Sequence, residues 1–132
     1  MDQTTLLVQF ALDDGRRFVE ALHSQPEFDL NATFWHYHSD LDRWTLIIAT
    51  PIVDKAGAGA AYERIIATID AMEPPFQWLK FTDVYAISPN DPLVVAAREN
   101  NKPIAIASPG RFVRGTYWNE FYIDEAYLYY VA

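Results

Sequence analysis

Eleven of the twenty aromatic residues in this chain lie in two short stretches, residues 34–44 and 117–130. Both stretches have the composition of β-strands, because aromatic side chains are favoured on pleated, half-buried surfaces. If the two strands share one sheet, that sheet carries a large aromatic surface. Helices, a partner or a ligand must then cover it, and this requirement limits the fold more than any other feature of the sequence.

The remaining segments predict an α+β fold. Apolar residues at helical spacing predict one helix over residues 4–25, and the alternative is a strand at 5–12 followed by a helix capped by Asp13. Asp91 and Pro92 are typical of a helix start. The other expected elements are strands at 30–38, 43–51, 81–88 and 104–107, one or two strands after residue 112, and helices at 54–72 and 91–100.

This order, α-β-β-α-β-α-β-β, predicts a single domain spanning residues 1–132. The polar link between the strands at 30–38 and 43–51 indicates a hairpin, whereas the helical links indicate crossovers. We therefore expect a mixed, largely antiparallel sheet of about five strands with about three helices, mainly on one face. The stretch 45–50 is apolar on both faces, which is typical of a central strand.

Composition excludes several classes of function. The net charge of −8 disfavours nucleic acid and anionic membrane as partners. The chain has no cysteine, which excludes disulfides and thiolate chemistry and fits a cytoplasmic location. The N-terminal residues lack the layout of a signal peptide, and no apolar run approaches the ~18 residues that span a bilayer.

The aromatic surface is the first candidate site. Trp35 and Tyr37 alternate along one strand, as do Tyr127 and Tyr129 along another, so each pair shares a face. Tyrosine and tryptophan are enriched at the centres of protein interfaces. We therefore expect these residues, with Trp118, to form an interface for a homodimer or another protein partner. The alternative is that the rings are shared within the domain's own core.

A metal site is the second candidate. His36 and His38 point to the same side of a strand, and Asp40 follows two residues later. Together with one carboxylate from Asp40, Asp124 or Glu125, two imidazoles suit zinc or iron in a hydrolase or oxygenase. The simpler alternative is a polar strand end beside a solvated turn. Likewise, Asp124 and Glu125 are expected to form a turn between strands 117–123 and 126–131.

Several motifs resemble those of a small bacterial protein family with no assigned function. The resemblance implies a compact intracellular α+β domain, and it brings no activity or catalytic residues with it. The motifs are Phe34-Trp35-x-Tyr37, Arg43-Trp44-x-Leu46-x-Ile48-Ala49-Thr50-Pro51-x-Val53-Asp54-x-x-Gly57, Ala61-Tyr62, Ile87-Ser88-Pro89-x-Asp91 and Tyr122-Ile123-Asp124-Glu125-Ala126-Tyr127-Leu128-Tyr129.

The leading hypothesis is thus a non-catalytic domain that self-associates or binds a protein partner through an aromatic sheet face, with no cofactor. No serine lies in a nucleophile-elbow motif, which favours a protein that is not an enzyme. The metal-dependent hydrolase or oxygenase is one alternative. The other is a small-ligand binder whose aromatic side chains line a pocket between sheet and helices.

Overall fold

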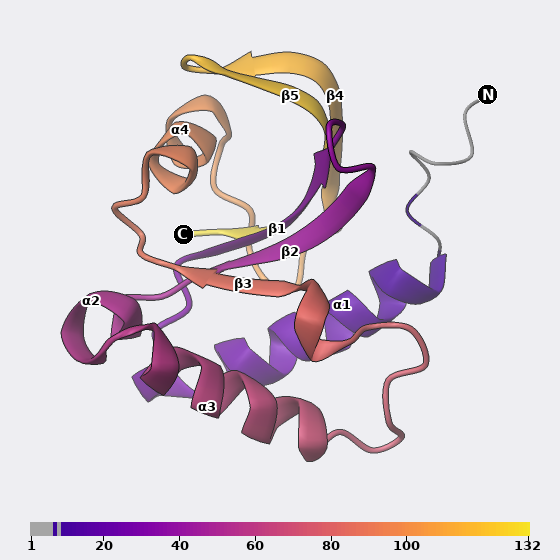
Figure 1. Cartoon of the computed structure of the whole chain (residues 1–132), viewed down its shortest axis with the longest axis vertical. Helices are drawn as coiled ribbons and strands as arrows, with labels where there is room; N and C mark the ends of the chain where they lie inside the picture. The colour runs from indigo at the N-terminus through magenta and orange to yellow at the C-terminus, as the bar shows by residue number, and fades with distance from the viewer. Residues whose placement is uncertain (1–6, 8) are drawn as a thin grey trace.

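Five strands form one sheet in the computed structural model, which describes residue 7 and residues 9–132 (Figure 1). Helices lie on both sides of this sheet. The elements in chain order are α1 (Gln9–His23), the 3-10 turn η2 (Pro26–Phe28), β1 (Ala32–His38), β2 (Arg43–Ala49), α2 (Ile52–Ala56), α3 (Ala58–Asp70), the 3-10 turn η3 (Phe81–Asp83), β3 (Val84–Ile87), α4 (Pro92–Asn100), β4 (Arg111–Trp118) and β5 (Phe121–Val131).

The predicted α+β class and the mixed, largely antiparallel sheet are confirmed. The strand order is β3-β2-β1-β5-β4, and only the pair β2–β3 is parallel. The expected hairpin joins β1 to β2, with His38 opposite Arg43. Both aromatic stretches lie in this sheet, and β1 and β5 are direct neighbours.

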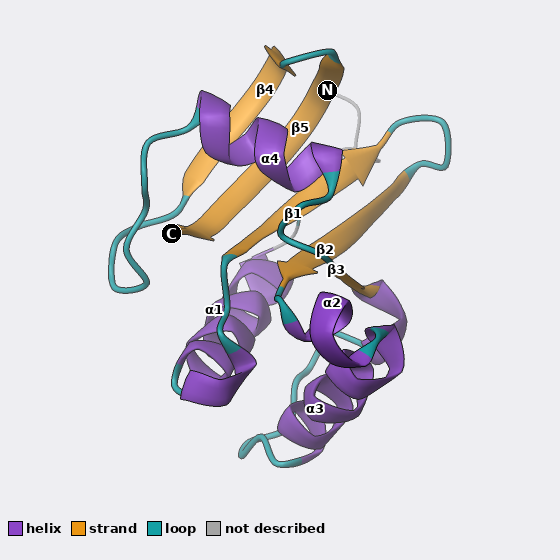
Figure 2. Cartoon of the chain, turned by 90° about the vertical axis from the view of Figure 1, so that its left-hand side faces the viewer, coloured by secondary structure: helices purple, strands orange, loops and turns teal. Residues whose placement is uncertain are grey.

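The sheet separates two apolar layers. On one face α1 and α3 cover Trp35, Leu46 and Ile48, whereas on the other α4 covers Phe34 and Ile47. Figure 2 shows α1 and α3 together on one side and α4 on the other. The interior strand β2 is buried on both faces, as its composition predicts. No helix in the described part of the chain is long and apolar enough to span a bilayer.

The first helix is continuous through the acidic Asp13-Asp14-Gly15 segment. The alternative of a strand is wrong for residues 9–12, which are helical, while residues 4–6 and 8 lie outside the described residues. Asp14 interrupts the apolar stripe because it has a structural role. It is buried, and its Oδ2 accepts hydrogen bonds from the backbone N–H groups of Trp78 (2.7 Å) and Leu79 (2.9 Å).

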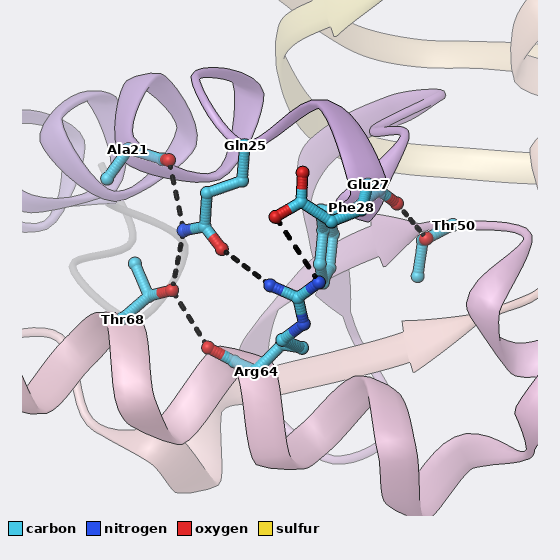
Figure 3. A network of polar contacts seen from close by, with 7 residues as sticks. All are labelled: Ala21, Gln25, Glu27, Phe28, Thr50, Arg64 and Thr68. Atoms are coloured by element: carbon cyan, nitrogen blue, oxygen red, sulfur yellow. Dashed lines mark hydrogen bonds and ion pairs between the residues drawn. The ribbon is translucent and has the colours of Figure 1, made fainter.

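The helix expected over residues 54–72 begins earlier and is broken. Gly57 has a φ of 89°, which favours glycine, and it separates α2 from α3. Thr68 is a buried polar residue of α3. It accepts a bond from Gln25 Nε2 at 2.9 Å and donates to the carbonyl of Arg64. Gln25 Nε2 also donates to the carbonyl of Ala21 in α1, so a polar network connects α1 to α3 (Figure 3).

The C-terminal hairpin turns at Asn119 and Glu120, so the turn expected at Asp124 and Glu125 is wrong. Asn119 has a positive φ of 55°, a conformation that asparagine tolerates. Its side chain bonds Glu99 and Asn100 at the end of α4, which fixes the tip of the hairpin over that helix (Figure 1).

Two further elements are shorter than expected. The segment at residues 104–107 is not a strand, since only Ile104 forms a bridge, to Val131. The segment at residues 81–88 begins with η3, so β3 keeps four residues. The start of α4 is as predicted, because Asp91 accepts a hydrogen bond from the N–H of Leu93 at 2.9 Å.

Candidate functional site

Four of the five aromatic residues expected at an interface are buried inside the domain. Trp35, Trp118, Tyr129 and Tyr37 have exposed fractions of 0–6%, and only Tyr127 is half-buried. The prediction that they form an exposed face is therefore wrong for those four. The rings are shared within the core because α1 covers one face of the sheet and α4, with Trp118 beside it, covers the other.

A buried hydrogen-bond chain holds α1 on this aromatic layer. Trp35 Nε1 donates to the Tyr129 hydroxyl at 2.9 Å, and that hydroxyl donates to the carbonyl of Leu12 at 2.8 Å. Burial raises the pKa of the Tyr129 hydroxyl well above its ordinary value, so it remains a donor at any physiological pH. Gly15 lies against this hydroxyl, where an added Cβ atom would overlap the Tyr129 oxygen.

Further along the same face, ring contacts cross four strands. Tyr37 of β1 packs on Trp44 of β2, with ring centroids 5.3 Å apart. Trp44 also contacts Phe112 of β4 at 6.4 Å, and Phe112 stacks on Tyr127 of β5 at 6.0 Å. The row ends at Phe112, which is 48% exposed, so the aromatic layer reaches the surface at β4.

Glu125 is a buried carboxylate whose charge is balanced across the β4–β5 pair. Its Oε1 lies 2.9 Å from Arg114 Nη2, and the arginine is largely exposed. The guanidinium also lies over the ring of Phe112, which places Glu125 on the α1 side of the sheet. The carboxylate can be buried within β5 because Arg114 of the neighbouring strand β4 balances its charge.

The two histidines lie on the opposite side of the sheet from Glu125. Phe34, His36 and His38 are every second residue of β1, so they share one face of the sheet, and Phe34 belongs to the α4 layer. The two histidine rings are 4.5 Å apart. The pKa of His36 is lowered to about 4, mainly by burial and then by the neighbouring His38, and Asp124 partly opposes both effects. The Nε2 atom of His38 is 2.9 Å from Thr45 Oγ1.

The structure does not assemble the expected metal ligands. No group of three or more histidine or carboxylate side chains among the described residues has an arrangement that suits a metal ion. Asp40 is exposed in the β1–β2 turn, and Glu125 lies on the other face. Of the three candidate carboxylates, only Asp124 affects the pKa of His36.

Surface depressions give little support to a small-ligand site. The depressions beside Trp78 and Lys80 and beside Phe10 and Arg17 are open to solvent and are not lined by the buried aromatic layer. The two apolar layers between sheet and helices are filled by side chains. The buried aromatic residues among the described part of the chain therefore pack against other side chains and do not line a pocket.

Sequence reasoning did not single out the residues that are in fact exposed. Tyr117 and Tyr122 are 64% and 53% exposed, and their rings pack together at 5.1 Å on the β4–β5 hairpin. Of the eight residues in β4 only Trp118 is buried. The signal that identifies this hairpin is Asn119-Glu120 between two aromatic runs, because asparagine favours turns.

The hairpin edge is thus where an exposed backbone and exposed aromatic rings coincide. β4 is the last strand of the sheet, so no strand of the described residues lies beside its outer edge. Comparison with known proteins found no matching family model, no matching curated protein and no matching solved structure. A function has to be inferred from the geometry of the chain's own residues.

Proposed function

We propose that this chain is a non-catalytic protein-interaction domain whose working surface is the outer edge of β4. The observation that carries the proposal is the exposure of that strand. Seven of its eight residues are exposed or half-exposed, although it belongs to a sheet whose interior strand β2 is buried. An end strand presents unpaired N–H and C=O groups, to which an extended segment of another polypeptide can add.

Exposed aromatic side chains support the same surface. Phe112 and Tyr117 belong to β4, and Tyr122 lies directly opposite Tyr117 on β5. Aromatic rings provide large contact areas at low cost in conformational entropy, so they are enriched where proteins meet. The leading hypothesis from sequence placed the interface on an aromatic sheet face that includes Trp35 and Tyr129. The present proposal places it at the outer edge of β4 instead.

Features that restrict pairing are also present on β4. Arg111 and Arg114 are charged, and Gly115 bends the strand with a φ of 60°. Natural edge strands use charges and bends to prevent indiscriminate association. A partner must therefore match both the charges and the bend, which makes the edge selective.

Two of the polar groups that suggested a metal site have structural partners. Glu125 is paired with Arg114, and His38 Nε2 lies within hydrogen-bond distance of Thr45 Oγ1. This supports a non-catalytic role. We further propose a cytoplasmic location, based on the absence of cysteine, and membership of the small bacterial family that the motifs resemble.

A displayed library of random twelve-residue peptides tests the proposal without a known partner. We expect enriched peptides to bind the wild-type chain and to lose binding to Tyr117→Lys, because lysine on an edge strand opposes strand addition. Tyr85→Lys is the matched control, since Tyr85 is 44% exposed on β3, the other end strand. Failure to enrich peptides, or binders that ignore Tyr117→Lys, would contradict the proposal.

A further inference from the structure

The charges of the β4–β5 hairpin are separated along its length. Arg111 begins β4 at the open end, and Glu120 lies in the turn at the other end. Both side chains are exposed, and neither forms a hydrogen bond or ion pair with any described residue. A basic end and an acidic tip on one edge make that edge electrostatically complementary to an antiparallel copy of itself.

Full overlap of two antiparallel β4 strands determines the register. Arg111 then lies opposite Trp118 of the second copy, and Phe112 lies opposite Tyr117 of the second copy. Glu120 of the second copy comes diagonally next to Arg111, within reach of its long side chain. Twofold symmetry repeats each contact, so the dimer gains two aromatic pairs and two ion pairs.

The bend in β4 is compatible with this register. In full overlap Gly115 of each copy lies opposite Arg114 of the other, and the twofold axis passes between these two pairs. The two positive-φ glycines are therefore diagonal neighbours at the centre of the ladder. No arginine lies directly opposite another arginine, which would be destabilising.

We infer that the partner at the β4 edge is a second copy of this chain, paired antiparallel through residues 111–118 about a twofold axis. The inference rests on the proposed function and names the partner for the same surface. A C2 dimer is the commonest closed assembly, and it covers both exposed edges with each other. The sheet thereby extends from five strands to ten.

Sedimentation at micromolar concentration tests the inference directly. We expect the wild type to sediment at twice the 15.1 kDa mass of the chain. Arg111→Glu and Glu120→Arg are each expected to weaken the dimer about tenfold, because each turns two attractive contacts into repulsive ones. The double variant exchanges the two charges and is expected to restore the wild-type affinity.

The outcomes separate this inference from the proposed function. Both substituted side chains are exposed, so the thermal unfolding midpoints should stay near the wild-type value and confirm that the variants fold. A chain that stays monomeric while β4-directed peptides still bind it overturns the inference and leaves the proposed function standing. A dimer that ignores Tyr117→Lys and both charge reversals overturns the inference as well, because its interface lies elsewhere.

Discussion

The half-buried His36 ring is expected to make the stability of the fold depend on pH. Its pKa falls from 6.5 to about 4 in the folded chain, through burial first and the neighbouring His38 second. Between these two values the unfolded chain binds a proton that the folded chain does not. The stabilising contribution of the neutral ring is therefore complete above pH 6.5 and is lost as the pH falls toward 4.

The size of the effect follows from the pKa difference. A difference of about 2.5 units corresponds to about 3 kcal/mol, at 1.36 kcal/mol per unit. The ring is half-buried, so water screens part of this effect, and about 2 kcal/mol is the reasonable expectation. The Nδ1 atom is buried without a hydrogen-bond partner among the described residues, which supports desolvation as the main cause.

Urea unfolding at a series of pH values from 8 to 4 measures this loss. His36→Gln removes the titrating ring. The free energy of unfolding of this variant should therefore decrease from pH 8 to pH 4 by about 2 kcal/mol less than that of the wild type. His23→Gln is the matched control, because His23 is exposed at the end of α1. Identical pH profiles for wild type and His36→Gln would refute the reasoning, since the carboxylates titrate equally in both.

Two further substitutions test contacts of α1, each measured by urea unfolding. Gly15→Ala is expected to lower the free energy of unfolding by about 1–3 kcal/mol, because its Cβ would overlap the Tyr129 hydroxyl, whereas Gly59→Ala meets no atom within 4 Å and should not destabilise. Asp14→Ala is expected to cost about 1–3 kcal/mol by leaving two loop N–H groups unpaired, and the exposed Asp13→Ala should cost much less. Equal effects within either pair would contradict the corresponding contact.

Local sequence patterns were sufficient for most of the fold. The alternation of side chains correctly separated Trp35 and Tyr37 from Phe34 and His36, because a strand directs successive residues to opposite faces. Asp91 correctly located the start of α4. The break at Gly57 was missed because the apolar spacing on its two sides suits one continuous helix, and glycine alone is weak evidence for a break.

The candidate site was harder to predict because it depends on contacts between distant segments. Asp124-Glu125 resembles a turn, since both residue types are depleted in strands. Glu125 nevertheless lies within β5, because Arg114, eleven residues earlier, balances its charge across the hairpin. Similarly, the amphipathic character of Trp35 and Tyr129 suggested a surface, but each polar atom bonds the other inside the core.

The position of the C-terminal turn decides which surface is available for binding. A turn at Asp124 would have placed Tyr117 and Tyr122 on one strand. Residues five positions apart on a strand point to opposite faces, so their rings would not meet. The actual turn places them opposite each other on β4 and β5, where their rings pack together outside the core. It also places Glu120 at the acidic tip and leaves all eight residues of β4 along one edge. An aromatic, charge-separated edge follows from a single asparagine that accepts a positive φ.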